Sequence, residues 1–178
     1  LGIRSLRDLT DVADTDRLTD PVLRRRARHV VADDQRVLEV VALLRASPGP
    51  SAGPSAGPSA GPSAGPSAGP SAGPSADTYR QIGRLLTQAH ASLRDDFEVS
   101  WPEADAAVEA AVGAGASGAR MIGGGFGGSV LALVPAAAGG PGSGPVRDAV
   151  TAAFARHGWT APEFLDAVPS DSARPLSG

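Results

Sequence analysis

A repeated tetrapeptide in the middle of the chain places the strongest limit on what this sequence can fold into. From Pro50 the unit Pro-Ser-Ala-Gly occurs six times and then ends in a partial seventh copy. Each proline removes a hydrogen-bond donor, each glycine is costly to order, and no side chain of the unit buries enough apolar surface to offset that cost. Residues 47–76 are therefore predicted to be a flexible, disordered low-complexity linker. A polyproline-like stretch that binds a partner is the alternative.

Helical periodicity flanks this linker on both sides. Asp20 is a predicted N-cap and Pro21 takes the first helical position, and apolar residues then recur at helical spacing through residues 21–45. Beyond the repeat, Asp77 is the predicted cap of a second helix whose apolar stripe covers residues 79–93. A linker between two packed helices would form an external loop, so the folded domain is expected to comprise residues 1–46 and 77–178.

The remainder of the sequence predicts an α+β domain. The segment Ser100-Trp101-Pro102-Glu103 has the pattern of a capping box, in which the serine and glutamate side chains bond the backbone of a third helix. After it, the sequence predicts strands over 119–122 and 129–134, a helix from Pro145 to Gly158, and a final strand over 163–168. This order predicts helices packed on one face of a mainly antiparallel sheet.

Composition excludes several kinds of site. All 16 basic residues are arginine, and Lys and Cys are absent, so the chain has no lysine to grip a phosphate and no thiol to act as a nucleophile or bind zinc. A net charge of −3 argues against a nucleic-acid partner, and no apolar run reaches the roughly 20 residues that a membrane span needs. We expect a cytoplasmic location by default. Because aromatic residues make up only 4%, the core must consist mainly of Ala, Val and Leu.

A run of glycines between two predicted strands is the strongest candidate site. Three of them match the spacing G-x-G-x-x-G, but that fingerprint requires a helix after it, and here a strand follows. The absence of a Lys-Ser or Lys-Thr pair excludes a Walker loop. A glycine-rich loop between two strands lets a ligand reach the main chain, and its backbone amides can converge on an anion. The alternative is a turn built for tight packing. The expected ligand-facing residues are Gly123, Gly124, Gly125, Phe126, Gly127, Gly128 and Ser129.

Three further groups of polar residues are weaker candidates. The arginines at 24–26 and 28 could hold a phosphate, but a solvated helix face is the favoured interpretation. His29 and His90 each lie on an apolar helix, where a structural hydrogen bond is more common than catalysis. The acidic cluster at 95–98 could bind Mg²⁺, although solvated carboxylates are favoured there as well.

Three segments resemble, in this order, the C-terminal half of bacterial galactokinases, whose superfamily also includes homoserine, mevalonate and phosphomevalonate kinases. The segments are RRRARHVV at 24–31, HASLRDDFEVS at 90–100 and ARMIGGGFGG at 119–128. The sequence differs from the family pattern at four positions. Ile122 stands where the family usually has Thr, Phe97 replaces Tyr, Trp101 replaces a small residue, and Ser172 replaces Gly.

The resemblance implies the C-terminal domain of a small-molecule kinase that transfers the γ-phosphate of ATP to galactose with the help of Mg²⁺, giving galactose 1-phosphate. It also implies that the glycine run faces the active-site cleft. The family's sugar signature, its phosphate loop and its catalytic Asp and Arg belong to the N-terminal half, and none has a counterpart here. We therefore expect the N-terminal kinase domain to be absent, the chain to contain no catalytic residue or metal ligand, and the chain alone to be inactive.

Two alternatives remain beside this interpretation. One is a related sugar or small-alcohol kinase, because the residues that choose the sugar belong to the other half. The other is a non-catalytic binding or structural module. The substitution Gly125→Val is expected to separate a ligand-facing loop from a packing turn, by reducing activity while leaving folding largely intact.

Overall fold

The protein is described by a computed structural model over residues 2–47, 74–135 and 142–167. Most of the predicted linker, Ser172 and the end of the predicted final strand lie outside these residues. The elements in order are two short 3-10 helices, η1 (Leu6–Asp8) and η2 (Val12–Arg17), then α1 (Pro21–Ala46), α2 (Ala76–Asp95), α3 (Pro102–Gly113), β1 (Gly118–Ile122), β2 (Ser129–Leu133) and α4 (Gly144–His157). Among the residues described, no helix is both long and apolar enough to cross a bilayer.

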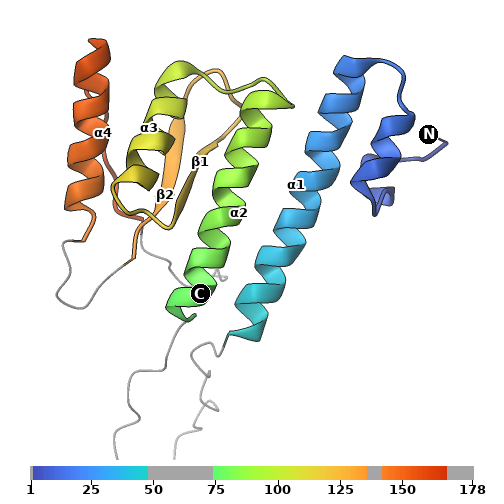
Figure 1. The fold of residues 1–178 in the computed structure, drawn as a ribbon, viewed down its shortest axis with the longest axis horizontal. Coiled ribbons are helices and arrows are strands. Elements are labelled where there is room, and N and C mark those ends of the chain that lie inside the picture. Colours follow the sequence, from blue (N-terminus) through green and yellow to red (C-terminus); the bar gives the residue numbers. More distant parts are fainter. Residues whose placement is uncertain (1, 48–73, 136–141, 168–178) are drawn as a thin grey trace, which may run out of the picture.

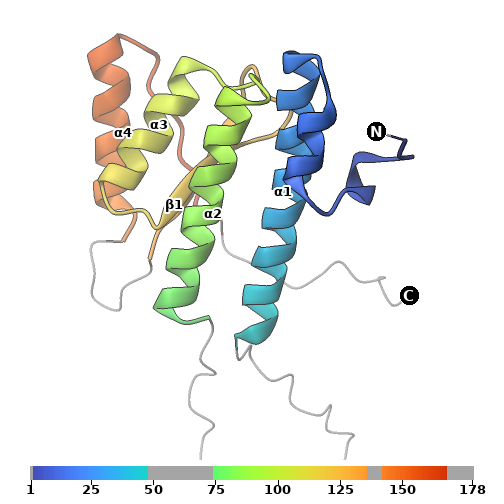
Figure 2. The ribbon, with the colours of Figure 1, turned by 45° about the vertical axis from the view of Figure 1, so that its right-hand side comes forward.

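Helices α1 and α2 run side by side in opposite directions (Figures 1 and 2). The predicted cap of α1 is confirmed, because the Asp20 carboxylate accepts from the backbone N–H groups of Val22 and Leu23. The predicted cap of α2 is wrong by two residues. Ser75 holds that position and its hydroxyl accepts from the Thr78 N–H. The Ser47 hydroxyl lies 3.4 Å from that of Thr78. The end of α1 is therefore next to the start of α2.

The predicted capping box at the start of α3 is not present. Pro102 occupies the first turn, so the N-cap is Trp101, which provides no side-chain hydrogen bond. Ser100 thus lies one residue too early to cap the helix. Its hydroxyl donates instead to the Asp105 carboxylate, at 2.6 Å.

The sheet of the described residues is one antiparallel hairpin. Its five pairs run from Gly118 opposite Leu133 to Ile122 opposite Ser129, so both predicted strands are confirmed to within one residue. Helices α2 and α3 cover one face, and α4 packs against α3 (Figure 1). This arrangement confirms the predicted α+β class with helices on an antiparallel sheet.

The predicted final strand is wrong as far as the structure describes it, since residues 163–167 form no strand. This segment associates with α4 through side chains. Arg147 pairs with Asp166 at 2.5 Å, and its guanidinium lies 5.4 Å from the ring centre of Phe164. Leu165 is 90% exposed, so this apolar side chain is not packed against the sheet.

Small aliphatic side chains build the core, as the composition predicts. One cluster joins α3, α4 and the hairpin through Ala107, Val108, Ala111, Ala116, Ala119, Val146 and Val150. A second cluster gathers Leu93, Val99 and Ala104 around Met121, which is completely buried. Val130 of β2 packs against both clusters, so the core is continuous beneath the hairpin.

Backbone contact between α2 and β1 sets the position of the hairpin. A Cβ added to Gly83 would overlap the carbonyl of Ser117, and one added to Gly118 would overlap the carbonyl of Gly83. Two glycines are therefore required where the helix crosses the strand. The close approach lets the Thr87 hydroxyl accept from the backbone N–H of Ala119, at 3.3 Å.

We predict that Gly83→Ala destabilises the fold by about 3 kcal/mol, since overpacking against backbone that cannot yield lies at the upper end of such costs. Gly113→Ala is the matched control, because nothing lies within 4 Å of its added Cβ. Removing that glycine from the end of α3 is expected to stabilise by about 0.5 kcal/mol. Urea unfolding followed by circular dichroism measures both effects, and equal stabilities of the two variants would contradict the prediction.

Candidate functional site

The glycine loop, residues 123–128, joins β1 to β2 and is seated on the segment that precedes α3. The backbone N–H of Phe126 donates to the carbonyl of Val99, at 2.9 Å. Gly125 lies directly on the same residue, since an added Cβ would come within 2.6 Å of the Val99 Cβ and 2.7 Å of its carbonyl oxygen. The loop is thus fixed at its centre to residue 99. Ser129, the first residue of β2, is exposed beside the loop.

Backbone conformation accounts for four of the five glycines. The glycines with positive φ are Gly123 (95°), Gly125 (90°), Gly127 (144°) and Gly128 (115°). Gly124 has neither a positive φ nor any atom within 4 Å of an added Cβ. It is the one glycine in the loop that neither conformation nor packing requires. The space above its main chain is open, as a ligand-facing position needs.

This geometry corrects the expectation that Gly125→Val would leave folding intact. A side chain at Gly125 would collide with Val99 and would also require an unfavourable φ of 90°. A side chain introduced at Gly124 instead tests ligand access without disturbing the packing of the loop. Phe126 is 77% exposed and has a φ of 57°, so the loop presents an aromatic residue to solvent.

The arginine run at the start of α1 is half-exposed to solvent, as the favoured interpretation expects, but its side chains are also ion-paired or hydrogen-bonded. Each arginine has a partner outside the run. Arg24 donates to the Leu18 carbonyl, and Arg28 pairs with Asp16 at 2.9 Å. Arg25 and Arg26 both bind Glu98, in the segment that carries the glycine loop. Sequence reasoning missed this pairing, because the partners lie more than 70 residues apart and no local pattern links them.

The acidic cluster at 95–98 is divided among separate partners. Asp95 binds Arg94 through two hydrogen bonds, at 2.8 and 3.0 Å. Asp96 accepts from the Ser92 hydroxyl, and Glu98 binds the two arginines of α1. Within residues 2–47, 74–135 and 142–167, no group of three or more acidic, His or Cys side chains is arranged to hold a metal ion.

His90 forms a buried connection between α2, α3 and β1. Its Nδ1 accepts from the backbone N–H of Met121 at 3.3 Å, so the proton resides on Nε2, which donates to the Asp105 carboxylate at 3.0 Å. Burial lowers the pKa of His90 below its ordinary value of 6.5, although the charge and hydrogen bond of Asp105 act in the opposite direction. This geometry matches the structural interpretation of the residue.

His29 forms the corresponding connection between α1 and α2. The Ser92 hydroxyl donates to Asp96 at 2.9 Å and therefore accepts from His29 Nδ1, 3.0 Å away. The ring stacks on Phe97 with their centres 4.6 Å apart. Burial lowers the pKa of His29 as well, so the ring is neutral near neutral pH.

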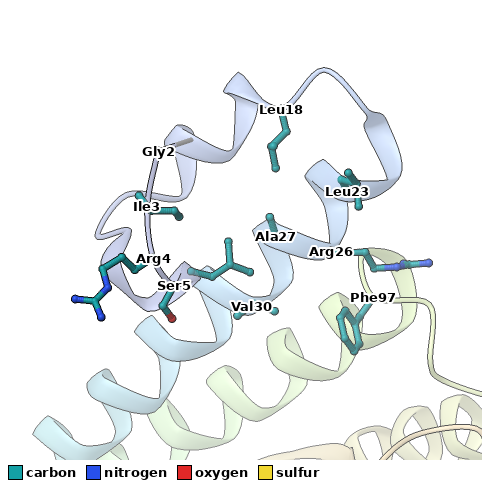
Figure 3. Close-up of a pocket in the computed structure, with 11 residues that line it drawn as sticks. Gly2, Ile3, Arg4, Ser5, Leu18, Leu23, Arg26, Ala27, Val30 and Phe97 are labelled. Atoms are coloured by element: carbon teal, nitrogen blue, oxygen red, sulfur yellow. The ribbon is translucent and has the colours of Figure 1, made fainter.

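An open apolar groove of about 570 Å³ lies beside α1 (Figure 3). Its walls are the segment Gly2–Leu6, apolar residues of α1 and the ring of Phe97, as the labelled side chains in Figure 3 show. None of the residues that line it belongs to the glycine loop. The groove is therefore separate from the candidate site.

Comparison with known proteins gives a consistent result. Residues 76–157 match the family described as GHMP kinases C terminal. The galactokinase of Streptomyces coelicolor is 44% identical over 99% of this chain, and that of Mycobacterium tuberculosis H37Rv is 40% identical over 76%. The matched regions are 38% and 30% of those two proteins, so the chain spans well under half their length.

A solved structure with a similar fold is the galactokinase of Lactococcus lactis complexed with galactose. It superimposes with a TM-score of 0.64 and 30% identity, over 89% of this chain and 34% of the other. The similarity therefore extends from sequence to three-dimensional arrangement, over nearly the whole of the chain.

The two buried histidines predict how stability depends on pH. Both have a folded-state pKa below the unfolded value, so the unfolded chain binds more protons in the interval between the two. Their contribution to stability is complete above about pH 6.5 and is lost as the pH falls through the folded values.

We accordingly expect a lower free energy of unfolding at pH 5.5 than at pH 7.5. Urea titrations at the two pH values measure this. In the double variant His29→Asn/His90→Asn the difference should be smaller than in the wild type. Greater stability at the lower pH would contradict the prediction.

Proposed function

The chain carries the C-terminal domain of the GHMP kinases and is homologous to the C-terminal portion of galactokinases, and from this premise we propose that it forms part of an ATP-dependent sugar kinase. The proposed reaction transfers the γ-phosphate of ATP to galactose and yields galactose 1-phosphate. The observation that carries the proposal is 44% identity to one galactokinase along 99% of this chain. A galactose complex of the Lactococcus lactis relative supports the choice of sugar.

The glycine loop is proposed to face the substrates. Phosphoryl transfer demands little covalent chemistry from the protein, and catalysis depends mostly on positioning and charge stabilisation. A loop with an open main chain at Gly124 and a fixed centre at Gly125 is suited to positioning. We assign Gly123 to Ser129 to this role and propose that ATP, Mg²⁺ and galactose are bound together with the remainder of the kinase.

Exposed apolar side chains on α1 support a larger assembly. Leu23, Val30, Val37 and Leu44 lie seven residues apart, hence along one stripe of the helix. Their exposed fractions are 57%, 38%, 53% and 47%. A continuous stripe of this kind favours a covering partner. We propose that this partner is the remainder of the kinase, because the relatives are much longer than the region they share with this chain.

A chimeric enzyme tests the proposal. Residues 1–178 would replace the matching C-terminal portion of the Streptomyces coelicolor galactokinase, and formation of galactose 1-phosphate from ATP would be measured. We expect the chimera to be active and the isolated chain to show no turnover. Normal turnover by the isolated chain would contradict the proposed division of labour. A folded chimera that phosphorylates another sugar but not galactose would favour the related-kinase alternative, and one that phosphorylates nothing would favour a non-catalytic module.

Two neighbouring glycines distinguish ligand approach from packing. Gly124→Val should change the stability of residues 1–178 by no more than about 0.5 kcal/mol, as surface substitutions do, because its added side chain meets open space. In the chimera the same change should lower kcat/KM at least tenfold, which corresponds to about 1.4 kcal/mol of transition-state binding.

Gly125→Val is the matched comparison, and it should lose stability and activity together. Thermal unfolding and steady-state kinetics measure the two effects. If Gly124→Val left kcat/KM unchanged, the loop would be a packing turn and its proposed contact with substrate would be wrong.

A further inference from the structure

Glu98 adopts a backbone conformation that few residues with a side chain tolerate. Its φ is 57°, in the left-handed region, where a Cβ crowds the following carbonyl. Such residues persist where the surrounding structure imposes the conformation, and they gather at functional sites. Among the described residues, Phe126 of the glycine loop is the only other one with a side chain and positive φ. Phe126 is the donor of the hydrogen bond to the Val99 carbonyl, and Glu98 directly precedes the acceptor.

Two neighbouring arginines of α1 bind the side chain of Glu98. Arg25 binds its Oε1 at 2.9 Å and Arg26 binds its Oε2 at 2.5 Å, so each carboxylate oxygen has its own guanidinium. Arg26 also donates to the carbonyl of Asp96, at 2.5 Å, and thus grips the segment at a second point. Its guanidinium lies 5.9 Å from the ring centre of Phe97, and Figure 3 shows the two side chains next to each other.

The residue after Glu98 carries the glycine loop. The backbone N–H of Val99 donates to the Leu93 carbonyl at 3.0 Å, and its own carbonyl accepts from Phe126. The Val99 side chain lies under Gly125, where no Cβ would fit. A rotation of the backbone at Glu98 would therefore move the carbonyl on which the loop is anchored.

We propose that Glu98, bound by Arg25 and Arg26, is a positioning residue that fixes the glycine loop through Val99. Its significance for catalysis rests on the proposed function, whereas its effect on the loop does not. The hydrogen bond from Arg26 lowers the pKa of Glu98, so the carboxylate is charged at neutral pH. Because the side chain of Glu98 is 48% exposed, solvent weakens these ion pairs, and they contribute little to global stability. We therefore expect the loss of these ion pairs to affect the loop locally.

Hydrogen exchange in residues 1–178 tests the effect on the loop directly. The Phe126 amide is the probe, since it is the donor to Val99. In Glu98→Gln its exchange should be faster by about tenfold, as expected when local opening becomes easier without global unfolding. The midpoint of urea unfolding should stay unchanged.

Asp95→Asn is the matched control. Asp95 also pairs with an arginine, Arg94, and is also exposed, but both of its hydrogen bonds go to that neighbouring residue and not to the loop or to α1. Its loss should leave Phe126 exchange unchanged. Arg26→Gln should speed the exchange as Glu98→Gln does, and the double variant should add little, because the two residues act through one interaction.

Kinetics of the chimera then test the catalytic consequence. Glu98→Gln should lower kcat about tenfold with a small change in the KM for galactose, since it displaces a loop without removing a substrate contact. Glu98→Asp, which keeps the charge, should recover part of the loss.

Unchanged Phe126 exchange in Glu98→Gln would overturn the proposal, whatever the chimera does. Faster exchange with unaltered kcat would overturn the catalytic role. If the unmodified chimera has no kinase activity, the proposed function fails, and the exchange experiment still decides whether Glu98 fixes the loop.

Discussion

Gly83 of α2 and Gly118 of β1 meet backbone to backbone, and this contact sets the positions of the hairpin and of the glycine loop. No side chain separates the helix from the strand, so α2 lies as close to the hairpin as main-chain atoms permit. At that distance the side chains of the next two turns of α2 reach the edge of β1. Thr87 accepts from Ala119, and His90 accepts from Met121. The hairpin is thereby aligned along α2 by hydrogen bonds as well as by packing.

The same contact determines where the glycine loop can be. Helix α2 ends at Asp95, and the chain turns through Val99 before α3 begins at Pro102. Because β1 is aligned along α2, its end comes beside this turn, and Phe126 meets the Val99 carbonyl. The polar interior links the same elements, since Asp105 of α3 accepts from both His90 and Ser100. The segment that carries the loop is therefore tied to α2 and α3 through the buried ring of His90 and the half-buried carboxylate of Asp105.

The glycine content of the loop has two physical origins. Most of the glycines satisfy backbone angles or the contact with Val99, and these would be needed in any hairpin of this shape. Gly124 alone is required by neither. The proposed contact with substrate therefore depends on this one position and not on the whole run of five glycines. The pairing of Glu98 with Arg25 and Arg26 connects α1 to the loop from the other side.

Features that depend on neighbours along the chain could be predicted from the sequence alone. Apolar periodicity and the Asp20 cap located α1, and the glycine run between two apolar segments located the hairpin and the candidate loop, because these signals act over a few residues. Contacts between distant segments could be read only from the three-dimensional structure. In it Ser100 binds Asp105, residues 163–167 form no strand, and Arg25 and Arg26 bind Glu98. It also shows that Gly125 is packed against Val99 whereas Gly124 is open. Each of these outcomes depends on atoms supplied by distant segments, whose approach no local pattern encodes.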